Sequence, residues 1–165
     1  MKDSRGRGFK DSSEMLKNYK ELNVWQKPYK LCLHIYKVTK RFPKDEMYGL
    51  TSQIRRSAVS IPSNIAKGYG RKTTLEYVRF LYIAYGSVCE LETQTMISGD
   101  LGYMGKERLQ ELREEIGDIE RMLKALIKSL ENKQLVEDPV DFHGESWNPG
   151  ILDPFLPTNW EKNPK

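Results

Sequence analysis

Histidine and cysteine are scarce in this chain, with two of each among 165 residues. The cysteines, Cys32 and Cys89, form no CxxC pair, and the two histidines are too few and too scattered to complete a tetrahedral zinc site. We therefore expect both thiols to be buried and reduced, as in a cytosolic protein, and we expect no bound metal. Nucleophilic catalysis is also disfavoured, because Cys32 and His34 are two positions apart on a predicted helix and cannot face each other.

Other patterns that carry chemistry are missing too. A di-metal carboxylate site in a helical bundle needs Glu-x-x-His pairs, and Leu31 and Val140 stand three positions before the two histidines. The glycines of the segment 68–72 lack the spacing of a phosphate-binding loop and follow a helical pattern rather than a strand. No run approaches the roughly 18 apolar residues of a membrane-crossing helix. We expect a cytoplasmic, non-enzymatic protein without catalytic residues, cofactor or membrane partner.

Charge is unevenly distributed along the chain. Lysine and arginine together number 27, and aspartate and glutamate together number 23. Residues 137–165 carry a net charge of −4, which leaves +8 on the remaining residues. A basic body with an acidic C-terminal segment favours an anionic partner for the body.

The first two predicted helices span about residues 24–41 and 48–69. Asn23 can cap the first helix, and Phe42 and Pro43 close it. Pro62 lies inside the second, but the apolar pattern keeps its phase there, so we predict one kinked helix, with two separate helices as the alternative. Apolar residues recur at helical spacing in both: Leu31, Ile35, Val38 and Phe42 in the first, and Leu50, Ile54, Ala58, Ile61 and Ile65 in the second.

The third and fourth predicted helices span about residues 74–101 and 106–132. Thr73 and Glu76 have the spacing of a capping box. Apolar residues surround the third helix, so either the neighbouring helices or another subunit must cover more than one of its sides. The fourth carries a seam in steps of three and four, typical of helices packed at shallow angles: Leu109, Leu112, Ile116, Ile119, Leu123, Leu126 and Leu130. The predicted fold of residues 20–132 is an all-α, antiparallel up-down-up-down four-helix bundle.

Two segments flank the predicted bundle. We expect residues 1–19 to form a flexible basic extension. Residues 133–165 contain five prolines, which argue against another long helix, and four large aromatics, which are more than a typical disordered linker has. We predict an acidic, non-helical tail. It is either an unstructured tail or an extended arm that docks its aromatic residues on this subunit, a neighbour or a partner.

One face of the second helix carries residues typical of nucleic-acid contacts. Arginine can grip phosphate oxygens with two parallel hydrogen bonds, and serine and asparagine add neutral ones. Tyr69 and Tyr77 can offer stacking surfaces to unpaired bases. Cations alternate with small polar residues along this face and past the helix end. The candidate nucleic-acid-binding residues are Arg55, Arg56, Ser60, Ser63, Asn64, Lys67, Arg71 and Lys72.

Two other interpretations of the same face stay open. Arg55 and Arg56 can be structural if they pair with Glu90 or Glu92 of the third helix. Alternatively, the small residues of the face can pack against another subunit.

The second helix also resembles the motif of a known family. Residues 50–66 have the sequence LTSQIRRSAVSIPSNIA, which is similar to the signature of the four-helix-bundle family encoded in intervening sequences of bacterial 23S ribosomal RNA genes. Segments 24–26, 48–50, 80–87, 90–94 and 101–103 match the same pattern, so the resemblance covers about residues 20–132. The motif commonly has an acidic residue at position 67, where this chain has Lys67.

The resemblance implies a homopentameric ring with a positively charged surface and no known catalysis. A more distant similarity, to the accessory variability protein of diversity-generating retroelements, implies binding to RNA or RNA/DNA and to a reverse transcriptase. Arg55, Arg56, Ser63 and Asn64 carry over as motif positions. The expected partners are therefore copies of the chain itself, RNA or RNA/DNA, and a reverse transcriptase or another protein. The alternative function is a protein-interaction scaffold whose ring displays the C-terminal tails, with the second helix's arginines structural.

Overall fold

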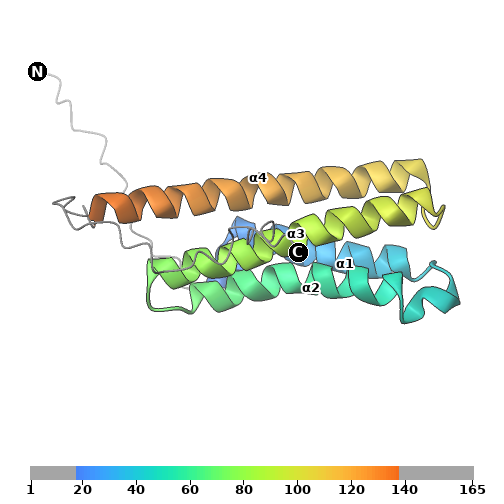
Figure 1. Ribbon diagram of the computed structural model, residues 1–165, viewed down its shortest axis with the longest axis horizontal. Helices are drawn as coiled ribbons and strands as arrows, with labels where there is room; N and C mark the ends of the chain where they lie inside the picture. The colour runs from blue at the N-terminus through green and yellow to red at the C-terminus, as the bar shows by residue number, and fades with distance from the viewer. Residues whose placement is uncertain (1–17, 138–165) are drawn as a thin grey trace, which may run out of the picture.

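Four long α-helices run side by side in the computed structural model, which describes residues 18–137, with side chains up to residue 133 (Figure 1). The helices are α1 (Asn23–Thr39), α2 (Leu50–Tyr69), α3 (Thr74–Asp100) and α4 (Lys106–Glu137). Two short 3-10 helices, η1 (Tyr19–Glu21) and η2 (Lys44–Met47), precede α1 and α2. No strand occurs in this described part. The all-α fold predicted from the sequence is confirmed.

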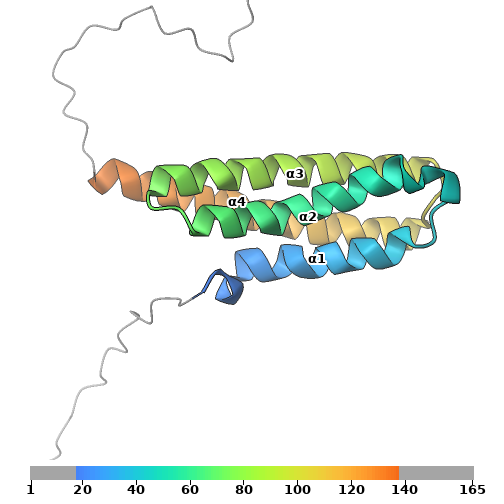
Figure 2. The ribbon, with the colours of Figure 1, turned by 90° about the horizontal axis from the view of Figure 1, so that it is seen from below.

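Successive helices alternate in direction and lie against each other, and α4 closes the bundle by packing on α1 (Figures 1 and 2). The most extensive contact is between α2 and α3, and the α1–α4 contact is the smallest of the four helix pairs. This is the predicted up-down-up-down order. None of the helices in residues 18–137 is long and apolar enough to cross a membrane.

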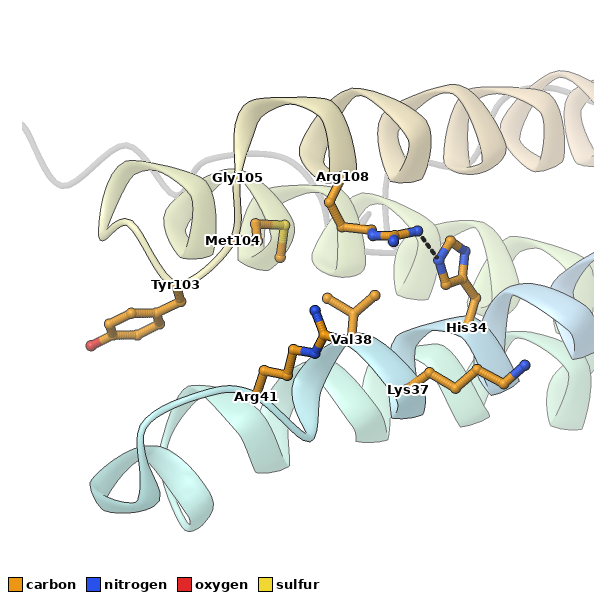
Figure 3. Close-up of a pocket in the computed structure, with 8 residues that line it drawn as sticks. All are labelled: His34, Lys37, Val38, Arg41, Tyr103, Met104, Gly105 and Arg108. Atoms are coloured by element: carbon orange, nitrogen blue, oxygen red, sulfur yellow. Dashed lines mark hydrogen bonds between the residues drawn. The ribbon is translucent and has the colours of Figure 1, made fainter.

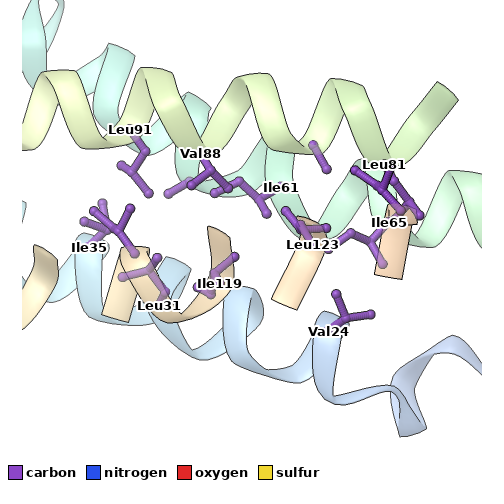
Figure 4. Packing of buried hydrophobic residues seen from close by; sticks show 14 of the residues in the cluster. Val24, Leu31, Ile35, Ile61, Ile65, Leu81, Val88, Leu91, Ile119 and Leu123 are labelled. Atoms are coloured by element: carbon purple, nitrogen blue, oxygen red, sulfur yellow. The ribbon is translucent and has the colours of Figure 1, made fainter. Parts of the chain in front are cut away.

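The core lies on the bundle axis and draws on all four helices (Figure 4). The predicted apolar stripes supply it, and complete burial of each large aliphatic side chain contributes about 1.5–3 kcal/mol. Five residues of these stripes are only half-buried: Val38, Leu50, Leu109, Leu126 and Leu130. Among the largest fully buried side chains are Leu31 and Ile35 of α1, Ile54, Ile61 and Ile65 of α2, Leu81, Val88 and Leu91 of α3, and Leu112, Ile116, Ile119 and Leu123 of α4.

Helix α2 is continuous through Pro62, as predicted, and that proline is buried. The helix begins at Leu50 and not at Tyr48, because η2 occupies the preceding residues. The Glu46 carboxylate accepts a hydrogen bond from the Leu50 N–H at 2.8 Å. This contact satisfies one of the open donors at the start of the helix.

The helix ends only partly follow the predicted caps. Leu22, whose side chain makes no capping bond, occupies the cap position of α1, and Asn23 is the first helical residue, so the prediction of an Asn23 cap is wrong. Thr73 does cap α3, because its Oγ1 accepts from the Glu76 N–H at 3.2 Å. Helix α4 continues to Glu137, so residues 133–137, predicted to be non-helical, are helical. The rest of the predicted tail and residues 1–17 lie outside the described residues.

The connection from α3 to α4 is a tight reversal. Gly102 has a φ of 74°, which a residue without a side chain adopts at little cost. The Tyr103 N–H bonds back to the Ser98 carbonyl at 2.9 Å, and the Gly102 N–H bonds to the Gly99 carbonyl at the same distance. Both bonds are typical of a helix ended by a left-handed glycine. The reversal places Tyr103 and Met104 beside the C-terminal end of α1 (Figure 3).

Both cysteines are free thiols, but neither is fully buried. Cys32 of α1 is half-buried, and Cys89 of α3 is exposed. The expectation of two buried thiols is therefore wrong for Cys89. Its position on the outward face of α3 is the physical reason, since neighbouring helices cover only the other side.

Candidate nucleic-acid interface

Helix α2 packs between α1 and α3 and leaves one face open to solvent. Arg56 and Lys67 are exposed on this face, eleven residues apart, which corresponds to about 16 Å along the helix. Val59, which is also exposed, lies between them. The predicted face therefore exists as a solvent-accessible stripe along most of α2.

Arg55 lies at the edge of this stripe and is anchored to α1. Its Nε donates to the Thr39 Oγ1 at 2.8 Å, and its guanidinium lies 5.0 Å from the centre of the Tyr36 ring. Thr39 is buried and also donates to the Ile35 carbonyl at 2.8 Å. These contacts hold Arg55 in place while leaving it half-exposed.

Arg56 is exposed and more loosely held. Its Nη2 donates to the Gln53 side chain at 2.7 Å, on the same helix. Neither Arg55 nor Arg56 forms an ion pair with Glu90 or Glu92, and the Glu90 carboxylate instead accepts from the Gln94 side chain at 3.1 Å. Within residues 18–133, therefore, neither arginine is held by an ion pair with a carboxylate of α3.

The small polar residues of the predicted site face α3. The hydroxyls of Ser60 and Ser87 lie 2.8 Å apart across the α2–α3 contact. The Asn64 amide is buried and donates to the Ser60 carbonyl at 2.9 Å and to its hydroxyl at 3.0 Å. Ser60 and Asn64 therefore pack within this subunit, whereas Ser63, whose hydroxyl donates to the Val59 carbonyl at 2.7 Å, is half-exposed.

Two further predicted cations extend the stripe beyond the end of α2. The Arg71 guanidinium lies 4.6 Å from the centre of the Phe80 ring of α3, and Lys72 is exposed. No described carboxylate forms an ion pair with Arg56, Lys67, Arg71 or Lys72. Uncompensated positive charge along one face attracts a polyanion.

Sequence reasoning missed the aromatic side chains next to the arginines. Tyr36 of α1 and Tyr48, which is 92% exposed, line an open groove of about 580 Å³ together with Arg55 and Arg56. Tyr48 precedes α2, so helical spacing along α2 gave no signal that it would lie beside Arg55. Tyr36 came from a different helix and carried no such signal either. A groove of tyrosine rings beside guanidinium groups suits unpaired bases and phosphates.

The tyrosines that were predicted to stack on bases pack on one another. The rings of Tyr69 and Tyr77 meet edge to face with centroids 6.4 Å apart, and Tyr19 packs 6.3 Å from Tyr69. Burial, and next the neighbouring Tyr69, raises the pKa of Tyr77. These rings lie at the opposite end of α2 from the groove and are half-buried.

The part of the chain that the structure describes also contains one cluster of side chains that could ligate a metal, although we predicted no metal site from the sequence. The ligand atoms of His34, Glu111 and Glu115 lie within 4.8 Å of one another between α1 and α4. Nδ1 of His34 is 2.8 Å from the Glu115 carboxylate, and the Arg108 guanidinium lies 3.2 Å from its Nε2. Both ring nitrogens thus already have partners, one of which is a cation.

Comparison with known proteins matches the bundle. The family model described as 23S rRNA-intervening sequence protein matches residues 20–125. Among solved structures, the chain is similar to a protein of unknown function from the S23 ribosomal protein family of Bacteroides thetaiotaomicron VPI-5482. The TM-score is 0.60 at 22% sequence identity, over 64% of this chain and 98% of that chain, a likeness of fold. A search of curated proteins found no match.

Proposed function

The chain belongs to the 23S rRNA-intervening sequence protein family, and from this membership and the cationic face of α2 we propose that it binds RNA, or RNA/DNA, without catalysing a reaction. The observation that carries the proposal is the row of exposed cations on α2 that have no carboxylate partner. A flexible polyanion can follow this row, because phosphate contacts need positive charge more than shape.

The eight candidate residues take different parts in this proposal. Arg56, Lys67, Arg71 and Lys72 contact phosphate oxygens. Arg55, held by Thr39 and Tyr36, contributes both to the fold and to the groove. Ser63 adds a hydroxyl at the edge, Ser60 joins α2 to Ser87 of α3, and Asn64 holds the Ser60 hydroxyl from within α2.

We also propose that the protein acts as a cytoplasmic homo-oligomer. Supporting this is the outward face of α3, where Leu75, Tyr82, Ile83, Met96 and Ile97 are exposed apolar side chains. Exposed apolar residues gathered on one helix are typical of a surface that another protein covers. The number of five subunits comes from the family resemblance, as does a role as an accessory subunit beside a reverse transcriptase or ribosomal RNA.

The test is RNA binding at several salt concentrations by the wild type and by Arg56→Ala with Lys67→Ala. Loss of two phosphate contacts is expected to reduce the slope of log K against log salt by about 1.4 for single strands. The matched control is Arg113→Ala with Lys128→Ala, which removes the same two residue types from exposed positions on α4.

Equal loss of RNA binding in both variants would show that net charge, and not the α2 face, attracts the nucleic acid. Absence of binding by the wild type at low salt would favour the scaffold alternative. In that alternative the anchoring of Arg55 to Thr39 and Tyr36 is purely structural, and binding to a protein partner would depend little on salt.

A further inference from the structure

A second cationic site lies between α1 and the start of α4, on different helices from the α2 face. A cavity of about 440 Å³ opens where the C-terminal end of α1 meets the α3–α4 turn (Figure 3). Val38 of α1 and Met104 of the turn line its apolar part. Sequence reasoning did not identify this site, because it forms only when the first and last helices of the bundle meet.

Three permanent cations line the cavity, and no carboxylate does. They are Lys37 of α1, Arg41 of the turn that follows α1, and Arg108 of α4. Lys37 and Arg41 have no ion-pair partner among the described residues, so their charges are not neutralised locally. A concave surface lined by one sign of charge concentrates the electrostatic field and attracts counter-ions. The start of α4 at Lys106 adds the positive end of a helix dipole to the same side.

Arg108 is held in position before any ligand arrives. Its Nη1 donates to the Glu111 carboxylate at 2.6 Å and lies 3.2 Å from Nε2 of His34. Nδ1 of His34 is in turn 2.8 Å from Glu115. This geometry fits an imidazole that donates from Nδ1 and accepts at Nε2. A guanidinium fixed in this way loses little freedom on binding, and its remaining N–H groups stay available to an acceptor.

The same contacts disfavour a metal ion at the His34, Glu111 and Glu115 group. Nε2 of His34 faces the Arg108 guanidinium, and Nδ1 is already in hydrogen-bond contact with Glu115, so neither ring nitrogen offers a metal a free lone pair. A divalent cation would also have to enter beside Arg108, with Lys37 and Arg41 lining the adjoining cavity. The charge of the site therefore selects an anion. The guanidinium groups of Arg41 and Arg108 match the oxygen geometry of phosphate, and the charges of Lys37 and Arg41, unpaired within the described residues, suit a dianion better than a single carboxylate.

We propose that the cavity between α1 and α4, lined by Lys37, Arg41 and Arg108 beside Val38 and Met104, binds a phosphomonoester group. The source of that group is either a free nucleotide or the phosphorylated end of an RNA strand. Its charged head pairs with the three cations, and the adjoining sugar or base contacts the apolar side chains. The site does not require the α2 face and stands independently of RNA binding there.

Titration of the full chain with adenosine monophosphate and with adenosine, by calorimetry and by NMR of the His34 ring, tests the site. Wild type is expected to bind adenosine monophosphate at least about tenfold more tightly than adenosine, since only the monophosphate can accept charge-assisted hydrogen bonds from these cations. Lys37→Ala with Arg41→Ala removes this preference. The control Arg113→Ala with Lys128→Ala keeps it. Arg41→Gln, which changes one exposed side chain, is a second and milder variant.

Two oligoribonucleotides of one sequence, with and without a 5′-phosphate, distinguish the sources. If the protein binds the phosphorylated strand more tightly, and Lys37→Ala with Arg41→Ala removes this difference, the source of the phosphate is an RNA end. Preference for adenosine monophosphate without any 5′-phosphate effect identifies a free nucleotide. The proposal is overturned when neither probe shows a phosphate preference that depends on Lys37 and Arg41. The α2 variant Arg56→Ala with Lys67→Ala is expected to weaken both strands equally and leave adenosine monophosphate binding intact, so the two proposals fail separately.

Discussion

Thr39 shows how a single buried hydroxyl can determine where an arginine lies. It sits in the last turn of α1, donates to its own helix and accepts from Arg55 of α2. The Arg55 side chain also covers the Tyr36 ring, so three residues from two helices form one unit. Arg55 can therefore stabilise the α1–α2 contact and still present part of its guanidinium to a ligand.

We expect the Thr39–Arg55 contact to be measurable in a double-mutant cycle. Thr39→Val removes the acceptor while keeping the side-chain shape, and Arg55→Met removes the donor. The interaction free energy of unfolding is expected to be about 0.5–1.5 kcal/mol, because hydrogen bonds of partly exposed groups have modest net values. Urea unfolding of the four proteins gives this number. Strict additivity of the two single changes would mean that the bond contributes nothing.

The two thiols are expected to differ in reactivity toward a disulfide reagent. Burial raises the pKa of Cys32, so at a given pH less of it is thiolate, the reactive form. Cys89 is exposed on α3 and is expected to react at least about tenfold faster. Reaction rates of Cys32→Ser and Cys89→Ser, followed separately at pH 8, measure each thiol alone. Slow reaction of Cys89 would indicate that another subunit covers this part of α3.

Among the elements, α2 and α3 approach each other closely at Gly68. A Cβ atom there would lie 2.8 Å from the Cβ of Phe80 and 2.8 Å from a ring carbon of Tyr77. Gly68→Ala is expected to lower the free energy of unfolding by about 1–3 kcal/mol, because the crowding outweighs the better helix propensity of alanine.

Gly117 offers the matched comparison on α4. A Cβ atom there would meet only the Arg121 guanidinium, at an ordinary 3.5 Å. Gly117→Ala is expected to raise the free energy of unfolding by about 0.5–1 kcal/mol, since glycine is costly within a helix. Urea unfolding at one protein concentration compares both variants with the wild type. Equal effects of the two changes would contradict the close approach at Gly68.

The spacing of residues within a helix was predictable from the sequence, whereas several helix ends and the contacts between helices were not. The α4 seam and the Thr73 cap depend on residues three or four apart; the cap occurs as predicted, and the middle of the seam, from Leu112 to Leu123, is buried as predicted, whereas towards the C-terminal end Ile127 is buried more deeply than Leu126. The start of α2 at Leu50 depends on Glu46, and the end of α4 has no stop signal at residue 132, so both limits were misplaced.

The same distinction holds for the candidate site. The exposed cations of α2 follow from helical spacing, so Arg56 and Lys67 were placed on the open face. Tyr36 reaches Arg55 from another helix, and the cavity beside Arg41 needs α1 and α4 together. Asn64 looked like part of a polar face, but its position on the α3 side of the helix buries it.

For the whole molecule, we expect the α3 face to decide the state of association. Ile83 and Ile97 are exposed on nearly the same side of α3, about four turns apart. Ile83→Glu with Ile97→Glu is expected to lower the mass measured by light scattering, because two buried charges would oppose the contact. Leu33→Glu, an exposed apolar residue of α1, is the control and is expected to leave the mass unchanged. A wild type that is monomeric at all concentrations would exclude the self-association proposal.

The closing contact of α4 on α1 has a consequence for the order in which the chain is made. Helices α1, α2 and α3 each pack on the next one in sequence, so these contacts form between segments that leave the ribosome one after another. Only α4, which is synthesised last, packs on a helix, α1, that left the ribosome long before. Until α4 is made, Leu31 and Ile35 of α1 stay uncovered on the side that α4 will occupy. The ribosome adds about 5–20 residues per second. The interval during which a chaperone or another nascent chain can reach this core is thus about the time needed to translate α4.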